Sequence, residues 1–149
     1  MGRDLRGCLC LSGVNLRAAI FTSADLNDAD FSSADLVDAD FADARLAGAV
    51  LSADLAGARL TGADLTRADL SGAVLTGARL IRAHLSHAIL AGASLMDADL
   101  WDADLTDASI DRADLAAANL RGANLRGANL HRAILTEASL HHASLPARI

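Results

Sequence analysis

The side chains in this sequence that could do chemistry are mainly aspartates, with a few histidines and two cysteines. His84 and His87 flank a predicted turn, and His141 and His142 are adjacent, so neither pair has the further converging ligands that a metal ion needs. The serines lie in no nucleophile motif such as G-x-S-x-G, and no glycine-rich loop could hold a phosphate. The sequence therefore predicts a non-enzymatic protein with no catalytic residue, metal site or cofactor.

The two cysteines do not indicate a redox or metal function. Cys8 and Cys10 lie two residues apart, a spacing at which a disulfide between extended residues would be strained. Two thiols are also too few for a structural zinc site. We expect both to be reduced and at least one to pack inside the N-terminal part of the molecule.

The charged residues are unevenly distributed along a chain whose net charge is −6 and whose thirteen basic residues are all arginine. Residues 25–54 hold eight Asp against one Arg, and residues 97–114 hold seven Asp against one Arg. Residues 55–96 hold two Asp against four Arg. This pattern predicts two acidic belts that ring the molecule, with a basic waist between them.

The acidic balance argues against direct binding of nucleic acid, because phosphates require a basic surface. A basic protein partner, or a protein that normally binds DNA, remains open. The alternative is that the carboxylates only keep the protein soluble. The candidate partner-binding carboxylates are Asp25, Asp28, Asp30, Asp35, Asp38, Asp40, Asp43, Asp97, Asp99, Asp102, Asp104 and Asp107.

A five-residue period must position these side chains. From Ala53 to Ala143 every fifth residue is alanine, and the residue two places after each is leucine, or isoleucine at 110. We name the leucine position i, so that the alanine is i−2 and the other three positions are i−1, i+1 and i+2. In an α-helix each leucine would be rotated about 140° from the last, which leaves no apolar face to bury. The period therefore argues against a helix.

An extended chain fits the same period. Positions i−2 and i then point to one side, and position i−1 points to the other. Residues from i to the next i−2 can form a four-residue turn whose third residue, i+2, needs a positive φ. Glycine occupies i+2 in many repeats, and Asp97, Asp102 and Asp107 occupy it in others, which are residue types that tolerate this conformation. We predict a coiled chain with Ala and Leu inside.

The period covers a single domain, residues 1–149, and is broken twice. Leu5 and Leu11 lie six residues apart, which predicts an irregular N-terminal coil over residues 1–14. Leu51 and Leu55 lie four apart, which predicts a one-residue register slip at 51–55. This slip should shorten one turn and could twist the two parts of the molecule relative to each other, either as a hinge or as a tolerated deletion.

The A(D/N)LXX pattern, as in ADLTR-ADLSG-AVLTG at residues 63–77, resembles the pentapeptide repeat family over nearly the whole chain. The resemblance implies an all-β, right-handed quadrilateral β-helix with four repeats per coil and about seven coils. At roughly 4.8 Å per coil the rod would be about 34 Å long.

The same resemblance implies a function. Some members of the family resemble duplex DNA in size and charge, and they bind DNA gyrase or topoisomerase IV and protect it from fluoroquinolone antibiotics. We therefore expect an acidic, rod-shaped binding module that engages such an enzyme. The alternative is a structural or scaffolding module with an unrelated protein partner.

A coil of 20 residues places residues 20 apart in one column. Phe21 and Phe41 should therefore stack inside the rod, with Phe31 on the opposite face of the core.

A second column should contain Ile81, Trp101, Arg121 and His141, all at position i+1. Trp101 should be exposed, with Arg121 placed for a cation–π contact. An exposed aromatic residue beside an arginine is typical of an interface anchor, and an isolated turn residue is the alternative.

No stretch approaches the roughly 20 apolar residues of a membrane helix, and the N-terminal MGRDLRGCLCLSG has no apolar signal-peptide core. We expect a cytoplasmic protein that does not bind membranes. The last coil should expose an unpaired sheet edge, apart from what Pro146 blocks, so a homodimer through this uncapped end coil is a further expectation.

Overall fold

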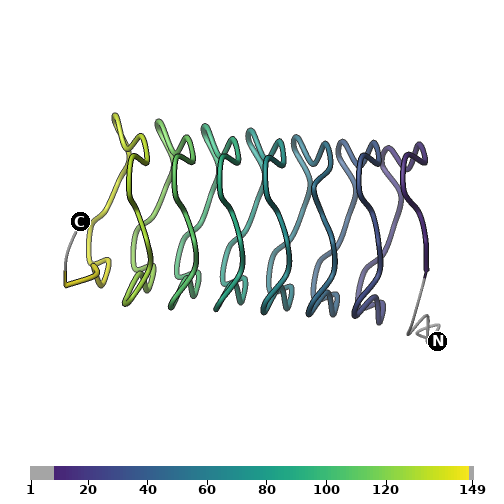
Figure 1. Cartoon of the computed structure of the whole chain (residues 1–149), viewed down its shortest axis with the longest axis horizontal. Coiled ribbons are helices and arrows are strands. Elements are labelled where there is room, and N and C mark those ends of the chain that lie inside the picture. Colours follow the sequence, from purple (N-terminus) through teal and green to yellow (C-terminus); the bar gives the residue numbers. More distant parts are fainter. Residues whose placement is uncertain (1–8, 148–149) are drawn as a thin grey trace.

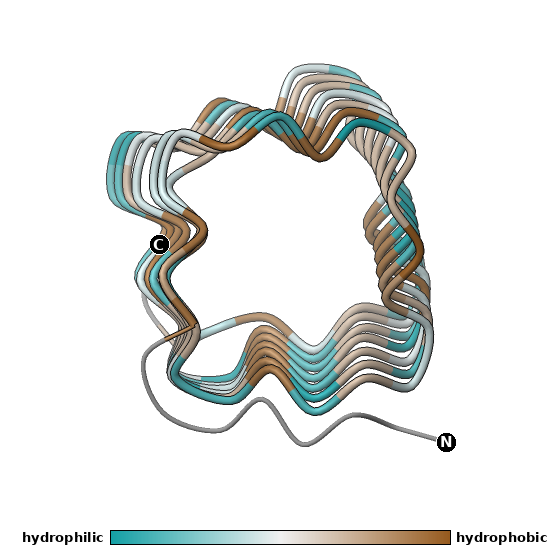
Figure 2. Cartoon of the chain, turned by 90° about the vertical axis from the view of Figure 1, so that its right-hand side faces the viewer, coloured by the Kyte–Doolittle hydropathy of each residue, from teal (hydrophilic) through white to brown (hydrophobic). Residues whose placement is uncertain are grey.

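The chain forms a rod in the computed structural model, which describes residues 9–147 (Figure 1). Successive coils stack along one axis, and the view along that axis shows a square outline with a turn at each corner (Figure 2). The described residues form no α-helix, and their only extended elements are isolated β-bridges. None of them therefore belongs to a helix that could cross a membrane.

Four columns of parallel β-bridges join the coils, and each defines one face of the rod. The bridges pair i−1 residues from Cys10↔Asp30 to Asn124↔Ser144, 20 positions apart except for four bridges that join residues 19 apart, so each coil contains four repeats. We name the faces A to D in chain order. Face A contains Cys10, Asp30, Val50, Asp69, Ile89, Ser109 and Asn129. Face B contains Asn15, Asp35, Asp54, Val74, Ser94, Asp114 and Ile134. Face C contains Ile20, Asp40, Arg59, Arg79, Asp99, Asn119 and Ser139. Face D contains Asp25, Arg45, Asp64, His84, Asp104, Asn124 and Ser144.

The predicted turns are confirmed at the corners. In each regular repeat the leucine carbonyl accepts a hydrogen bond from the next alanine N–H, as between Leu60 and Ala63 at 3.1 Å. The third residue of the turn has a φ between 53° and 70°, both at glycines and at larger residues such as Arg67 and Arg82. The Arg82 N–H also donates to the Trp101 carbonyl of the next coil at 2.9 Å. Stacking of the coils thus offsets the cost of about 1–2 kcal/mol for a non-glycine residue in this conformation.

The core is made almost entirely of the i−2 alanines and the i leucines. Near the N-terminus the rings of Phe21 and Phe41 stack with centroids 4.9 Å apart, as predicted. Phe31 lies two repeats from each along the coil and contacts both rings edge-on at 5.8 Å. No polar or charged residue is buried within residues 9–147, so the outer positions carry all the polar chemistry of the described chain.

The register slip is confined to one corner. The bridges that cross it, such as Asp35↔Asp54 and Val50↔Asp69, join residues 19 apart, and the spacing returns to 20 at Asp54↔Val74. Residues between Leu51 and Leu55 have no positive φ and no turn hydrogen bond. The missing residue therefore removes the turn between faces A and B in a single coil, and every column continues beyond it.

The predicted irregularity over residues 1–14 is wrong for residues 9–14. Cys10 forms a regular bridge to Asp30, and the Val14 N–H closes a regular turn on the Leu11 carbonyl at 3.2 Å. Cys10 is a free and exposed thiol because it occupies position i−1, which points away from the core. Leu5 and Cys8 lie outside the described residues.

Candidate protein-interaction surface

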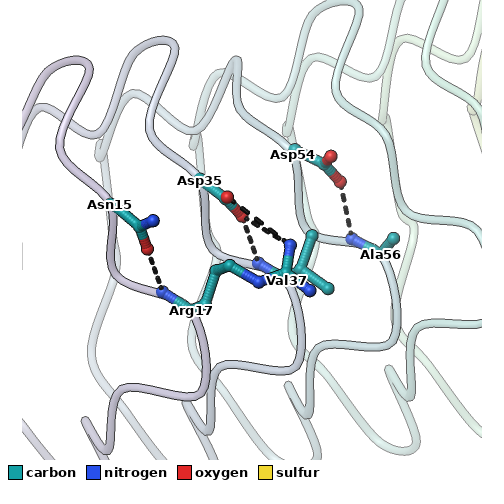
Figure 3. Close-up of polar contacts among 6 residues, drawn as sticks. All are labelled: Asn15, Arg17, Asp35, Val37, Asp54 and Ala56. Carbon is teal, nitrogen blue, oxygen red and sulfur yellow. Dashed lines mark hydrogen bonds and ion pairs between the residues drawn. The ribbon is translucent and has the colours of Figure 1, made fainter.

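The i−1 aspartates have a structural role that the sequence did not indicate. Each accepts a hydrogen bond from the backbone N–H two residues later, as from Val37 to Asp35 at 3.3 Å and from Ala56 to Asp54 at 3.1 Å (Figure 3). Asn15 accepts the same bond from Arg17 at 3.2 Å, so Asn can replace Asp in this role. This local bond fixes the start of the turn. Position i−1 is therefore not free for binding alone.

This role applies to half of the predicted partner-binding carboxylates. The predicted site residues that accept this bond are Asp25, Asp30, Asp35, Asp40, Asp99 and Asp104. At Asp30, hydrogen bonds from the Ser32 hydroxyl and then from its backbone N–H hold the pKa of the carboxyl below its ordinary value. These carboxylates are half-buried between neighbouring turns, so each presents only part of its surface to a partner.

The i+2 aspartates are more exposed, and most of them lie over a glycine of the next coil. A methyl group at Gly48 would lie 2.5 Å from Oδ1 of Asp28, and one at Gly57 would lie 2.5 Å from Oδ1 of Asp38. The remaining pairs of this kind are Asp43 with Gly62, Asp102 with Gly122 and Asp107 with Gly127. These glycines therefore give room to a carboxylate as well as allowing a positive φ. Asp97 has Ala117 at the equivalent place.

The two acidic belts differ in their ion pairs. In the N-terminal belt, arginines of neighbouring coils pair with three i−1 carboxylates: Arg17 with Asp35 at 3.3 Å (Figure 3), Arg45 with Asp25 at 3.4 Å and Arg59 with Asp40 at 3.1 Å. These exposed pairs contribute little stability, but they remove charge from faces B, C and D. The N-terminal belt is thus partly neutralised.

The second acidic belt keeps its charge. Within residues 9–147 its only ion pair with an arginine joins Asp111 to Arg112 at 3.6 Å, and His131 Nδ1 lies 2.8 Å from the other carboxylate oxygen of Asp111. Asn119 donates a side-chain hydrogen bond to Asp99 at 2.8 Å, and Asn124 donates one to Asp104 at 3.2 Å. Because these donors are uncharged, the bonds leave the negative charge of both carboxylates in place. Six carboxylates of this belt have no ion pair in the described chain: Asp114 on face B, and five on faces C and D and their corners. We call these five, Asp97, Asp99, Asp102, Asp104 and Asp107, the open belt.

The basic waist does not ring the rod, contrary to the prediction. The basic side chains between residues 55 and 96 all lie on faces C and D or on the two corners that border face D. They are Arg59, Arg67, Arg79, Arg82, His84 and His87. Faces A and B carry no basic residue over this range, and they expose Val74, Ile89 and, at the corner after face B, Met96. The waist is therefore a one-sided patch.

Trp101 lies on the corner between faces C and D, where the basic patch meets the open belt. This residue is 41% exposed, as expected from its i+1 position. The guanidinium over its ring belongs to Arg82, whose Cζ lies 5.1 Å from the ring centroid. The prediction named Arg121, which follows Trp101 in the same column but has no cation–π contact with it in the described chain. Arg82 makes the cation–π contact because its i+2 side chain projects from the preceding coil across the tryptophan.

The surface hollows are shallow. One of about 610 Å³ lies beside Glu137–His142 in the last described coil, and another of about 380 Å³ lies at the corner where the turn is missing. No group of three or more His, Cys, Asp or Glu residues within the described chain could hold a metal ion. This geometry fits contact with a macromolecule better than enclosure of a small substrate.

Comparison with known proteins assigns the fold. The sequence profile of the pentapeptide repeats matches residues 10–48, 34–86, 73–112 and 112–146. The chain belongs to the pentapeptide repeat family. No curated protein sequence matches it.

Solved structures of this family support the assignment. HetL from the cyanobacterium Nostoc, a protein involved in the regulation of heterocyst differentiation, is 36% identical, with a TM-score of 0.60 over 93% of this chain and 75% of HetL. Rfr23 from the cyanobacterium Cyanothece is 38% identical, with a TM-score of 0.61 over 62% of this chain. The chain spans 63% of Rfr23. QnrB1, a plasmid-mediated fluoroquinolone resistance protein, is 15% identical with a TM-score of 0.46, and this likeness carries no information about function.

Proposed function

We propose that this pentapeptide repeat protein is a non-enzymatic binding module that contacts a basic protein surface through its open belt and Trp101. The proposal rests on the open belt, whose five carboxylates have no ion pair in the described chain and are gathered on faces C and D and their corners. Exposed charges of one sign steer and orient a complementary partner, and an exposed tryptophan can anchor the contact.

The charge density of the open belt favours a partner that normally binds DNA. Duplex DNA carries one charge per roughly 1.7 Å of axis, or about three over the rise of about 4.8 Å of one coil. The open belt places five carboxylates within residues 97–107, about half a coil. A type II topoisomerase such as DNA gyrase is the first partner to test, and the cytoplasm is the proposed place of action.

A regulatory scaffold is the second candidate. HetL, which overlaps 93% of this chain at 36% identity, is described as a protein involved in regulation of cell differentiation. This relative favours a partner that is unrelated to topoisomerases. The exposed Val74 and Ile89 on faces A and B offer such a partner an uncharged contact surface.

A gyrase supercoiling assay, with and without a fluoroquinolone, tests the first candidate. The test variant replaces Asp99, Asp102, Asp104 and Asp107 by Asn, which retains the i−1 hydrogen bond and tolerates a positive φ. The control variant replaces Asp35, Asp38, Asp40 and Asp43 by Asn, so both lose four charges. We expect the test variant to weaken inhibition or protection, and the salt dependence of binding, more than the control variant does.

Two outcomes would redirect the proposal. If micromolar protein neither binds gyrase nor alters its activity, the topoisomerase is not the partner. If both variants bind gyrase equally well, the open belt is not the contact surface. Circular dichroism and urea unfolding of both variants would separate loss of binding from loss of fold.

A further inference from the structure

Face C places an arginine beside an aspartate without an ion pair between them. Arg79 and Asp99 are neighbours in the central column of this face. Arg45 and Arg59 each pair with a carboxylate of the preceding coil, but the preceding neighbour of Arg79 is Arg59 itself. Asp99 is followed by Asn119, which donates an uncharged hydrogen bond to it. Within residues 9–147, both charges on face C therefore lack an ion-pair partner.

The two corners that border face C carry a projecting ring and a bare stretch of backbone. Trp101, the only tryptophan of the chain, is exposed at the corner between faces C and D and belongs to the coil of Asp99. Gly77 lies at the opposite corner, between faces B and C, and belongs to the coil of Arg79. A methyl group on Gly77 would meet no atom within 4 Å, so this corner has room for a side chain from another molecule.

We propose that face C binds a second copy of this chain, in an antiparallel dimer with two-fold symmetry. The two-fold axis passes through the middle of face C, at right angles to the rod, between the coils of Arg79 and Asp99. This operation exchanges these two coils and also the two corners that border the face. It therefore places each Arg79 opposite Asp99 of the other copy, and each Trp101 opposite Gly77 of the other copy. A two-fold interface must be complementary to itself, and face C meets this condition in charge and in shape.

The rest of face C is compatible with this arrangement. In the four central coils the same axis places Arg59 opposite Asn119, and Arg121 opposite Ala56 and Gly57, so no like charges are opposed there. Face C is also one of the four sides of a rod whose surface measures 7253 Å² (Figure 2). One side is therefore large enough for the roughly 800 Å² per partner of a standard interface. Opposed charges fix the register of such a contact, and an aromatic anchor contributes affinity.

A second copy fits face C better than a partner with charge of one sign. A uniformly basic or uniformly acidic surface would oppose either Arg79 or Asp99 with a like charge. The dimer would cover Asp99 and Trp101, which the proposed function assigns to a basic protein partner, so self-association and binding of that partner would compete. The dimer is tested in the absence of that partner, and its failure would leave the proposed function in place. The surface also differs from the uncapped end coil.

Sedimentation velocity of the full chain over a range of protein concentrations tests the proposal, with Trp101 fluorescence measured on the same samples. We expect a monomer at low concentration and a dimer at high concentration. The emission of the single tryptophan should move to shorter wavelength along the same curve, because the dimer removes water from its ring. A monomer at every concentration would overturn the proposal.

Charge reversal identifies the interface. Arg79→Asp and Asp99→Arg each create two pairs of like charges across the axis, so each should raise the Kd of the dimer by more than about tenfold. An equimolar mixture of the two variants should form a heterodimer, because every aspartate at the axis then faces an arginine. The chain that carries both substitutions should dimerise as the wild type does. Arg126→Asp, on the corner between faces D and A, makes the same change of charge outside the interface and should leave the Kd unchanged.

Three results with the variants would count against the dimer. If Arg79→Asp weakens self-association no more than Arg126→Asp does, the contact uses another surface. If the mixed variants stay monomeric although circular dichroism shows both folded, the two charges do not meet across the axis. If dimerisation leaves the Trp101 emission unchanged, the ring lies outside the contact. Aspartate and arginine both occur at position i−1 elsewhere in the chain, but if Asp99→Arg does not fold, the comparison of Arg79→Asp with Arg126→Asp decides.

Discussion

The pairing of i+2 aspartates with glycines of the next coil makes a quantitative prediction at Gly62 and Gly77. Both glycines have a φ of 67°, so replacement by alanine imposes the same backbone cost at both positions. They differ in one respect. A methyl group at Gly62 would collide with Oδ1 of Asp43, whereas one at Gly77 would meet no atom within 4 Å.

The expected losses of stability follow from the backbone cost of a positive φ and from the collision with Asp43. Alanine at a positive φ costs about 1–2 kcal/mol, reduced by about 0.4–1 kcal/mol because the unfolded chain also loses freedom. We therefore expect Gly77→Ala to lower the free energy of unfolding by roughly 1 kcal/mol. At Gly62 the Asp43 side chain must also leave its preferred rotamer, which adds about 0.5–1.5 kcal/mol. A difference of 1 kcal/mol corresponds to a shift of about 2–4 °C in Tm for a chain of this size.

Urea unfolding of both variants measures the two costs, and a double-mutant cycle isolates the contact. In the Asp43→Gly background the collision is absent, so Gly62→Ala should cost no more than Gly77→Ala does in the wild-type chain. Equal costs at the two glycines in the wild-type background, or a Gly62→Ala cost that Asp43→Gly does not change, would refute the carboxylate-over-glycine arrangement.

Three further outcomes are expected. Asp30→Asn keeps the turn hydrogen bond but removes the titration of this carboxyl. Because the pKa of Asp30 is lowered in the folded state, its carboxylate stabilises the wild-type fold above about pH 4. The advantage of the wild type over the variant in urea unfolding should therefore disappear as the pH falls from about 5 to 2, and a constant difference would contradict this expectation. Arg82→Gln should change the fluorescence of Trp101, whereas Arg121→Gln should not. The reverse result would place the Arg121 guanidinium, not that of Arg82, at the ring. Phe31→Ala should lower the free energy of unfolding by about 3–5 kcal/mol, because this fully buried ring contacts two others, and a loss below about 1 kcal/mol would show that the core refills the space.

The path of the backbone could be predicted from the residue spacing alone. A strict five-residue period admits one efficient solution, in which i−2 and i face inward, and the turn position i+2 follows from the placement of glycine and aspartate. The stacking of Phe21 on Phe41 followed from counting 20 residues per coil. Such inferences succeed because each repeat contacts only its neighbours, so local spacing is nearly the whole fold.

The tertiary structure decided what the outer positions do. Sequence spacing treats i−1, i+1 and i+2 as equivalent surface, but the hydrogen bonds show that an i−1 aspartate such as Asp35 holds its own turn. Charge counts along the chain also do not show position around the axis, because they do not assign each residue to its column. The basic residues therefore appeared to form a ring until the β-bridges placed them on one side.

The same reason explains Trp101 and the missing turn. The column rule correctly placed Arg121 after Trp101, but the direction in which an i+2 side chain reaches, here that of Arg82, depends on the geometry of the stacked turns. The four-residue spacing between Leu51 and Leu55 signalled a missing turn. Only the hydrogen-bond pattern between coils showed which backbone groups that loss leaves unpaired, because those bonds join residues about 20 positions apart.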